Sequence, residues 1–380
     1  MEKQLERRQE AEPVTYSTRI EQIWGRARAD QEKAASLPHV VKFREIPWAQ
    51  NATTYQKDYC GAGGIPARLS EVPIHTIDVL EQIVFPGGRS GKHRHFMEAL
   101  FYIMEGEGYE IHDDIKYPWQ AGDIMCVPSY CIHQHFNARP DQPARLLFSV
   151  PLAYELSGLA FIEQIEMHQA YQLGEGATFL RGTQGEVIGY RNDEGQEIYF
   201  SAVDMEFQNM MEAKGASRPV EEPGNTYDRY LKTLEEQTQR RQSVPHVVHG
   251  DQLPWEDTPM GRLKYYLSPY QPSPLLLYDA YVQELPPGGR SGKHRHVGEE
   301  VHKILDGKGY DIHDETRWDW EAEDIVFVPI NTVHQHFNAD PQRPARFLVI
   351  QPRLYHYMGF GGIEHFEDAP DWDAPANRKA

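Results

Sequence analysis

The chain has 380 residues, of which 40% are hydrophobic and 25% charged, and its formal net charge is −19. This acidic balance argues against nucleic acid or an anionic membrane surface as a partner, and the sequence has no run of about 18 or more apolar residues. Three cysteines without a CxxC pair, and an N-terminus without an apolar core, predict a cytoplasmic protein. The length is sufficient for two domains that each bury a core.

The predicted elements begin with a charged helix at 17–35, within an N-terminal helical arm of residues 1–45. Residues 46–162 contain short apolar runs separated by Gly and Pro, a pattern typical of a small antiparallel sandwich or barrel. The rest of the chain repeats this order after a linker. The predicted parts are a linker and packing segment at 163–225 with weak strands at 186–190 and 197–203 and a short helix at 205–213, a second helical arm at 226–250 with a helix at 227–241, a second barrel at 251–365, and a C-terminal tail at 366–380.

The sequence is an internal duplication. Three segments recur at a constant offset of 201 residues, and one earlier segment recurs at an offset of 207. The pairs are PGGRSGKHRH at 86–95 and 287–296, GEGYEIHDD and GKGYDIHDE at 106–114 and 307–315, CIHQHFNARPDQPAR and TVHQHFNADPQRPAR at 131–145 and 332–346, and PHVVKFREIPW and PHVVHGDQLPW at 38–48 and 245–255.

Each copy carries two His-x-His pairs, and residues i and i+2 of a strand point to the same face. One such pair alone is more typical of a surface strand, but the recurrence of both pairs at identical spacing favours metal ligands. Neutral imidazoles suit Fe(II), Mn(II), Cu(II), Ni(II) or Zn(II). The lack of cysteine among the candidate ligands argues against structural zinc. The inward histidines are predicted to be His93, His95, His133 and His135 in the first copy and His294, His296, His334 and His336 in the second.

Other residues of the repeated segments have plainer interpretations. Lys92 and Arg94 alternate with the histidines and are expected on the outer face, solvated or paired. Arg89 and Arg290 either meet a substrate carboxylate or stabilise the turn, and the second role is favoured. Tyr109 and Tyr310 are candidates for lining the barrel. The remaining histidines are interpreted as hydrogen-bonded structural residues: His39, His112, His246 and His313.

The histidine segments resemble the first motif of the cupin superfamily, G-x5-H-x-H-x3,4-E-x6-G. The second copy matches it in full, and this resemblance implies a metal site of His294, His296, Glu300 and His334. The first copy has Ala99 where the Glu belongs, and Glu98, one position early, would face the other way. The resemblance implies an all-β dominated fold with two tandem cupin barrels (double-stranded β-helix or jelly-roll) and short helical arms.

The first copy is also similar to the gentisate 1,2-dioxygenase family, through HRHFMEALFYIMEG and PSYCIHQHFN. Members of that family are bicupins that cleave the ring of hydroxybenzoates with O2 at a three-histidine Fe(II) site. The resemblance implies that His93, His95 and His133 bind Fe(II) and that His135 is a catalytic residue beside the substrate, with His336 at the same position in the second copy. Tyr130, Ile132 and Gln134 depart from the family pattern, so the substrate does not transfer.

Three functions remain open. The favoured one is a non-haem Fe(II)-dependent dioxygenase that cleaves a hydroxylated aromatic (gentisate- or salicylate-like) or another chelating acid with O2. The second is a Mn-type bicupin decarboxylase or isomerase, similar to oxalate decarboxylase, because Glu300 gives the second cupin a set suited to Mn(II) or another divalent transition metal. A non-catalytic storage bicupin ranks last, because both histidine sets are kept. The resemblance further implies a homo-oligomer, a dimer or tetramer.

Overall fold

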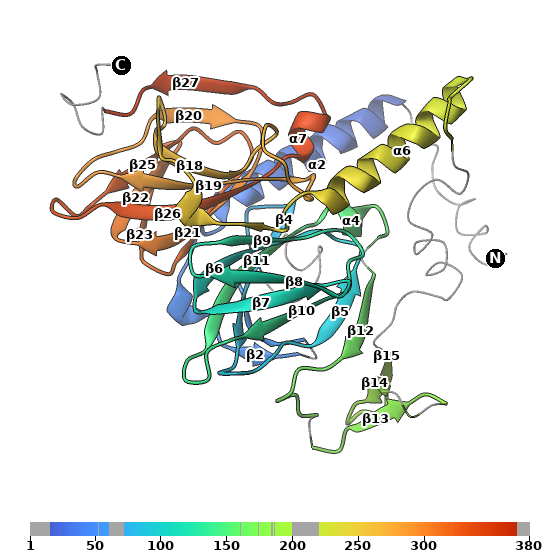
Figure 1. The fold of residues 1–380 in the computed structure, drawn as a ribbon. Coiled ribbons are helices and arrows are strands. Elements are labelled where there is room, and N and C mark those ends of the chain that lie inside the picture. Colours follow the sequence, from blue (N-terminus) through green and yellow to red (C-terminus); the bar gives the residue numbers. More distant parts are fainter. Residues whose placement is uncertain are drawn as a thin grey trace.

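The structure is a computed structural model that describes residues 16–51, 53–60, 72–159, 161–173, 175–183, 185, 187–199 and 220–370. It confirms the predicted class: two antiparallel jelly-roll barrels with a few helices (Figure 1). Each barrel consists of a seven-stranded sheet and a five-stranded sheet. The helix predicted at 205–213 lies outside the described residues, as do the last ten residues of the predicted tail.

The first barrel has a seven-stranded sheet with the order β16-β9-β6-β11-β4-β3-β2 and a five-stranded sheet with the order β12-β5-β10-β7-β8. Short runs rich in Val, Ile, Tyr and Phe form the strands, with Gly-containing turns between them. The strands are β2 (Ala49–Gln50), β3 (Tyr55–Asp58), β4 (Ile77–Val84), β5 (Lys92–His95), β6 (Ala99–Glu105), β7 (Glu107–His112), β8 (Ile115–Gln120), β9 (Ile124–Val127), β10 (His133–Asn137), β11 (Ala144–Pro151), β12 (Ile162–Glu166) and β16 (Val247–Val248).

The second barrel repeats this arrangement, with the orders β1-β24-β21-β26-β19-β18-β17 and β23-β22-β25-β20-β27. Its strands are β1 (Val40–Val41), β17 (Glu256–Thr258), β18 (Gly261–Leu267), β19 (Tyr278–Leu285), β20 (Lys293–His296), β21 (Glu300–Asp306), β22 (Lys308–His313), β23 (Thr316–Glu321), β24 (Ile325–Val328), β25 (His334–Asn338), β26 (Ala345–Pro352) and β27 (Ile363–Glu367).

Two longer helices precede the barrels: α2 (Tyr16–Ser36) and α6 (Thr226–Ser243), close to the predicted 17–35 and 227–241. Asn225 caps α6 by accepting a hydrogen bond from the backbone N–H of Asp228. Within the described part of the chain, none of the helices combines the length and apolar character needed to cross a membrane. The remaining elements are α4 (Ala153–Leu156), α7 (Leu354–Tyr357), the 3-10 turns η1 (Phe43–Glu45) and η2 (Gly250–Gln252), and a separate sheet of β13 (Thr178–Arg181), β14 (Val187–Arg191) and β15 (Glu197–Tyr199).

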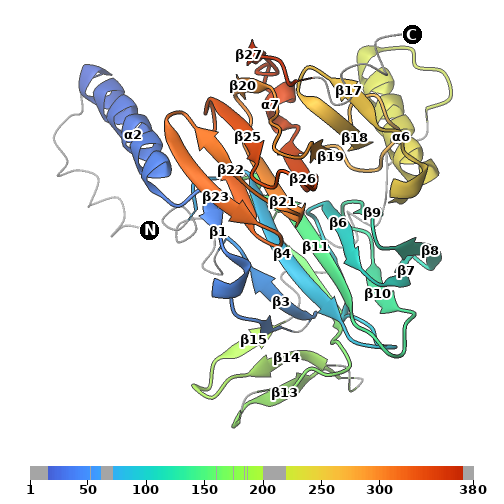
Figure 2. The same cartoon turned by 90° about the vertical axis from the view of Figure 1, so that its left-hand side faces the viewer.

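The two repeats exchange a strand. β1, which follows the first arm helix, pairs antiparallel with β24 of the second barrel, and Figure 2 shows it beside that barrel. β16, which follows the second arm helix, pairs in the same way with β9 of the first barrel. Each PHVV segment therefore completes the barrel of the opposite repeat.

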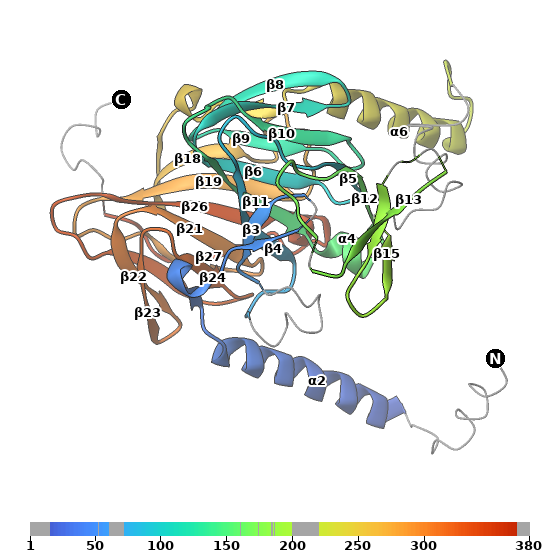
Figure 3. The same ribbon diagram turned by 90° about the horizontal axis from the view of Figure 1, so that it is seen from below.

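The two seven-stranded sheets pack face to face, and Figure 3 shows the barrels in contact while α2 extends away from them. Strand alternation divides each strand between two cores. On β6, Leu100 and Tyr102 face the shared core, whereas Ala99 and Phe101 face the interior of the first barrel.

Two buried carboxylates bridge the repeats. Glu299 accepts hydrogen bonds from the backbone N–H groups of His75 (2.8 Å) and Thr76 (2.9 Å) and from both of their side chains. Glu98, its counterpart in the first repeat, accepts from the backbone N–H groups of Leu276 (2.9 Å) and Leu277 (2.5 Å). Glu98 thus faces the other repeat rather than the histidines of its own barrel.

Candidate metal centres

The first centre joins two strands of the five-stranded sheet. His93 and His95 lie on β5, and His133 at the start of β10 is paired directly with His93. The ring of His133 lies 4.2 Å from the ring of His93 and 4.9 Å from that of His95, between centroids. All three side chains are buried, and one nitrogen of each lies within 4.8 Å of the others. The structure therefore brings the three histidines of the first copy into one cluster.

Backbone carbonyls orient these three rings. The Nδ1 atoms of His93, His95 and His133 lie 3.3, 2.5 and 3.0 Å from the carbonyl oxygens of residues 91, 97 and 131. A ring that donates through Nδ1 presents the lone pair of Nε2 to a metal. The Nε2 of His133 is buried and has no hydrogen-bond partner among the described residues, as expected of a ligand atom.

Burial also keeps these imidazoles neutral, the form that binds metal. Burial and then the neighbouring His95 lower the pKa of His93 to about 3, and burial lowers the pKa of His95 to about 4. The three neutral imidazoles of His93, His95 and His133 therefore fit a divalent transition metal that would keep further coordination positions for other ligands.

The second centre has a fourth member. His294 and His296 lie on β20, His334 on β25, and Glu300 at the start of β21, with one ligand atom of each within 4.8 Å of the others. The carboxylate of Glu300 lies 3.0 Å from Nε2 of His296. Burial alone would raise the pKa of Glu300, but the adjacent histidines hold it well below its usual range. The four predicted residues thus form one cluster containing a carboxylate.

Polar side chains surround Glu300. His302 lies 2.8 Å from one carboxylate oxygen, the hydroxyl of Tyr281 donates to the other at 3.4 Å, and the amide of Gln351 donates to that same oxygen. At the positions that correspond to these residues and to Glu300 by the offset of 201, the first barrel is apolar. These positions hold Leu80, Ala99, Phe101 and Val150.

The last histidine of each copy, His135 or His336, contacts a carboxylate instead of joining the three-histidine cluster of its barrel. Nδ1 of His135 lies 2.5 Å from Oε2 of Glu110 on β7, and Nδ1 of His336 lies 2.9 Å from Oδ2 of Asp311 on β22. Burial would raise the pKa of Glu110, but His135 and His112 lower it to about 2. Sequence reasoning missed both carboxylates, although each stands two residues before a repeated histidine in YEIHDD and YDIHDE.

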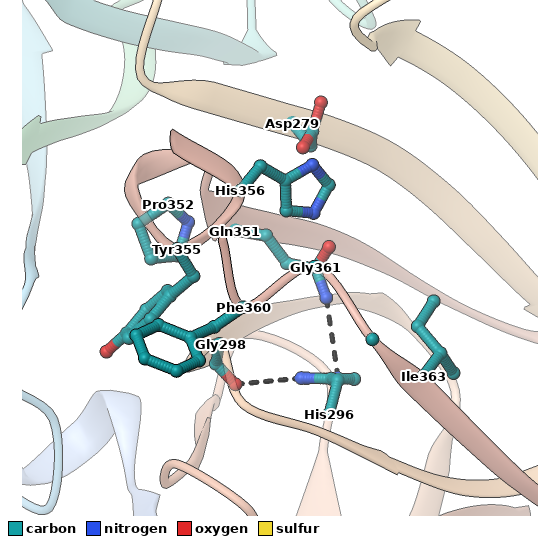
Figure 4. Close-up of a pocket in the computed structure, with 11 residues that line it drawn as sticks. Asp279, His296, Gly298, Gln351, Pro352, Tyr355, His356, Phe360, Gly361 and Ile363 are labelled. Carbon is teal, nitrogen blue, oxygen red and sulfur yellow. Dashed lines mark hydrogen bonds between the residues drawn. The ribbon is translucent and has the colours of Figure 1, made fainter. Parts of the chain in front are cut away.

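The surroundings of the two centres differ as well. A pocket of about 40 Å³ adjoins the second centre; Asp279, His296, Gln351 and His356 are among its polar lining residues, with Gln351 and His296 3.5 Å apart (Figure 4). This volume is sufficient for a few water-sized molecules. Beside the first centre, Phe96 and Tyr130 stack with 4.7 Å between ring centroids. The corresponding residues of the second repeat are Val297 and Asn331.

The remaining candidates have structural places. Arg89 pairs with Glu166 at 3.6 Å, and Arg290 pairs with Glu367 at 3.1 Å, in agreement with the favoured turn role. Arg94 is buried and paired with Glu163 on β12. The prediction that Tyr109 and Tyr310 line the barrel is wrong. Each stacks on the phenylalanine paired with it, Phe136 or Phe337, and alternation places these pairs on the outer face.

Comparison with known proteins agrees with the fold and the duplicated centre. The family model for the cupin domain matches residues 80–150 and 281–351, the core of each barrel. The chain is a bicupin, with two cupin domains in tandem.

Three relatives indicate the range of similar proteins. A curated 5-aminosalicylate 1,2-dioxygenase of a Comamonas species is 27% identical over 75 residues, which is 20% of this chain and 19% of that protein. The match thus spans about a fifth of the curated relative. A salicylate 1,2-dioxygenase structure from Pseudoaminobacter salicylatoxidans, in an adduct with gentisate, has a TM-score of 0.53 and 15% identity, covering 94% of this chain and 96% of that one. An oxalate decarboxylase structure from Bacillus subtilis has a TM-score of 0.51 and 13% identity, covering 83% and 77%.

Proposed function

We propose that the protein is a non-haem Fe(II)-dependent dioxygenase that uses O2 to cleave the ring of a hydroxylated aromatic acid, gentisate- or salicylate-like, or a related chelating acid. The observation that carries this proposal is the first centre, where three buried histidines converge and Ala99 stands in place of a fourth ligand. A metal held by three neutral imidazoles would leave positions available for a bidentate acid and for O2.

The residues around the first centre suit such a substrate. His93, His95 and His133 would hold the Fe(II), which supplies the activation of O2. The apolar side chains at the positions of the polar residues in the second barrel, Phe101 and Val150 among them, would pack against an aromatic ring.

His135 has the geometry of a proton acceptor. With Nδ1–H donating to the carboxylate of Glu110, the lone pair of Nε2 is left available, and Nε2 has no hydrogen-bond partner among the described residues. We propose that His135 accepts the proton of a substrate hydroxyl as the substrate binds, and that His336, whose Nδ1 lies 2.9 Å from Asp311, has the equivalent role in the second cupin.

The substrate class also draws support from relatives. The curated relative is named for 5-aminosalicylate, and the salicylate dioxygenase structure was determined with gentisate. These acids share a carboxylate beside a ring hydroxyl, which suits two-point binding at a three-histidine centre.

The test begins with metal content per chain, measured by mass spectrometry on protein purified without oxygen or chelator. We expect iron as the main metal, and O2 uptake with gentisate, salicylate or 5-aminosalicylate that yields a ring-opened product. Manganese with little iron, together with no O2 uptake by the iron-loaded protein on any of these acids, would refute the dioxygenase proposal.

A second candidate applies to the second cupin: a Mn(II)-dependent decarboxylase or isomerase of a small acid. Glu300 would supply a fourth ligand and a negative charge, and the small adjoining pocket includes the polar side chains of Asp279 and Gln351. Release of CO2 from oxalate by the Mn(II)-loaded His93→Ala variant would support this activity. If that variant releases no CO2 from oxalate, the proposed decarboxylase activity of the second cupin is refuted.

We further propose that the protein acts in the cytoplasm as a homo-oligomer, a dimer or tetramer. The three cysteines, Cys60, Cys126 and Cys131, are buried thiols rather than disulfides, which suits a reducing compartment. Ile23 and Trp24 expose 55% and 70% of their surface on α2 and offer an apolar contact for a second copy. Light scattering after size-exclusion chromatography tests the oligomer, and a monomer at micromolar concentration would contradict it.

A further inference from the structure

The two PHVV histidines lie in the barrel of the opposite repeat. His246 follows α6 and is carried into the first barrel by β16, where its ring stacks on Tyr117 with 4.7 Å between centroids. His39 follows α2 and is carried into the second barrel by β1, where it stacks on Trp318 at 4.6 Å. Both side chains are buried, with 7% and 5% of their surface exposed.

From His246 a chain of contacts leads to the first centre. Its Nδ1 lies 2.6 Å from Nδ1 of His112, and Nε2 of His112 lies 3.1 Å from Oε1 of Glu110. The other oxygen of Glu110 lies 2.5 Å from Nδ1 of His135. His135 is two residues from the ligand His133 on β10, and a nitrogen of each lies within 4.8 Å of a Glu110 oxygen.

The second barrel contains the same chain with a shorter carboxylate. Nδ1 of His39 lies 2.7 Å from Nδ1 of His313, whose Nε2 lies 3.4 Å from Oδ2 of Asp311. The same oxygen lies 2.9 Å from Nδ1 of His336. Asp311 also lies 3.8 Å from Nδ1 of His302, and Nε2 of His302 contacts the ligand Glu300 at 2.8 Å.

The contact between two Nδ1 atoms fixes which ring carries the proton. At 2.6 Å one nitrogen must donate and the other accept. Nε2 of His112 lies 3.1 Å from the carboxylate oxygen of Glu110, outside hydrogen-bond geometry, and this nearby negative charge favours the tautomer with the proton on Nε2. In that tautomer Nδ1 of His112 accepts and His246 donates. His246 thereby favours the tautomer of His112 whose Nε2–H faces the charge of Glu110. Glu110 in turn orients His135 through its other oxygen.

We propose that His246 is a positioning residue of the first metal centre and His39 of the second, so that each centre is completed by the opposite repeat. This inference rests on the proposed metal centres but not on the dioxygenase activity. It also explains why both copies share the PHVV and IHD segments: each His-His contact joins one of them to the other across the repeats.

The test measures Co(II) binding and its visible absorption in two backgrounds that each keep one centre. His294→Ala with His296→Ala leaves the first centre, and His93→Ala with His95→Ala leaves the second. Into each background we would introduce His246→Gln, His39→Gln, or the matched Asn variants. The Asn amide nitrogen falls near the position of Nδ1 and retains the contact, whereas that of Gln falls near Nε2 and loses it.

The controls lie on the same arms, three residues further along. His249 contacts Asp123 at 3.0 Å and Lys42 contacts Asp324 at 2.7 Å, so each joins an arm to the opposite barrel outside the chain of contacts. His249→Gln and Lys42→Gln thus perturb the docking of the arm without touching His112 or His313.

We expect a crossed pattern. His246→Gln should weaken Co(II) binding about tenfold and shift the absorption bands only where the first centre remains, and His39→Gln only where the second remains. The Asn variants should restore binding, and the controls should have no effect. Equal effects on both centres, effects matched by the controls, or no effect would overturn the inference. Absence of Co(II) binding in both backgrounds would instead refute the metal centres themselves, whereas Co(II) binding without O2 uptake would count only against the dioxygenase.

Discussion

At the scale of single residues, one exchanged position distinguishes the two centres most strongly. Glu300 would lower the net charge of a bound divalent metal by one and could serve as a fourth ligand, whereas Ala99 offers neither charge nor ligand. The residues around this position differ in the same way. Glu300 contacts the polar side chains of His302, Tyr281 and Gln351, whereas the first barrel has apolar side chains at those positions. A buried carboxylate needs such partners, and the apolar side chains at these positions of the first barrel provide none.

Ala99→Glu should therefore abolish O2 uptake with aromatic acids while the first centre still retains metal. The added carboxylate would take the position that the substrate or O2 requires. Ala99 is only 1% exposed, so a larger side chain carries an overpacking cost of about 1–3 kcal/mol. Ala99→Gln is the matched control, since it has the same size without the charge. Oxygen-electrode assays and metal analysis of both variants test this prediction. Retained O2 uptake in Ala99→Glu would contradict the placement of the substrate or O2 beside residue 99.

At the scale of strands and helices, local pattern was sufficient for much of the fold. Alternation along KHRH and HQHF predicted which histidines share a face, because the period of two is a property of any strand. The duplication then placed the same set in both halves. The arm helices were also predictable, from their charged, amphipathic runs at 17–35 and 227–241.

The exchange of β1 and β16 was not predictable from the sequence. A two-residue Val-Val strand gives the same local signal whichever barrel it joins, and its partner is set by packing between distant segments. Glu110 and Asp311 were missed for a related reason, since their role depends on the strand paired beside them. A comparison of inward positions between the copies, such as Gln351 with Val150, would have revealed the polar side chains that surround Glu300 in the second centre.

The exchanged strands predict a specific loss of stability in acid. Burial, and then the neighbouring His313, lower the pKa of His39 to about 4, and burial with His112 does the same for His246. The unfolded chain regains a histidine pKa of about 6.5, so between pH 6.5 and 4 it binds more protons than the folded state. This contribution to stability is fully present above pH 6.5 and is lost as the pH falls toward 4.

Thermal unfolding at pH 7 and pH 5 checks this expectation. The double variant His39→Gln, His246→Gln should show a smaller decrease in Tm between the two pH values than the parent protein. The exposed His356 provides the control, as His356→Gln should retain the parental decrease. An unchanged decrease in the double variant would show that these two histidines are not responsible.

At the scale of the whole molecule, the two barrels share one core. The largest apolar cluster contains residues of both repeats, because the outer faces of the two seven-stranded sheets pack on each other. Strand exchange and the carboxylates Glu98 and Glu299 add contacts in both directions. A cupin separated from its partner would expose this core and lose a strand.

Unfolding in urea should consequently show a single transition, and Glu299→Ala should lower its midpoint without splitting it. The variant removes the acceptor of the part-buried backbone N–H groups of His75 and Thr76, at a cost of at most about 1–3 kcal/mol for each group left unpaired. Circular dichroism and tryptophan fluorescence should report the same midpoint. Two separated transitions would mean that the barrels fold independently.

The central claim is that the two centres of this bicupin differ in chemistry and that ring cleavage belongs to the first. The most direct test compares His93→Ala and His294→Ala, each loaded with Fe(II) without oxygen, for O2 uptake with gentisate and salicylate. We predict that His93→Ala abolishes uptake and that His294→Ala retains it with metal at the first centre. Loss of uptake only in His294→Ala would contradict the account and assign the chemistry to the second cupin.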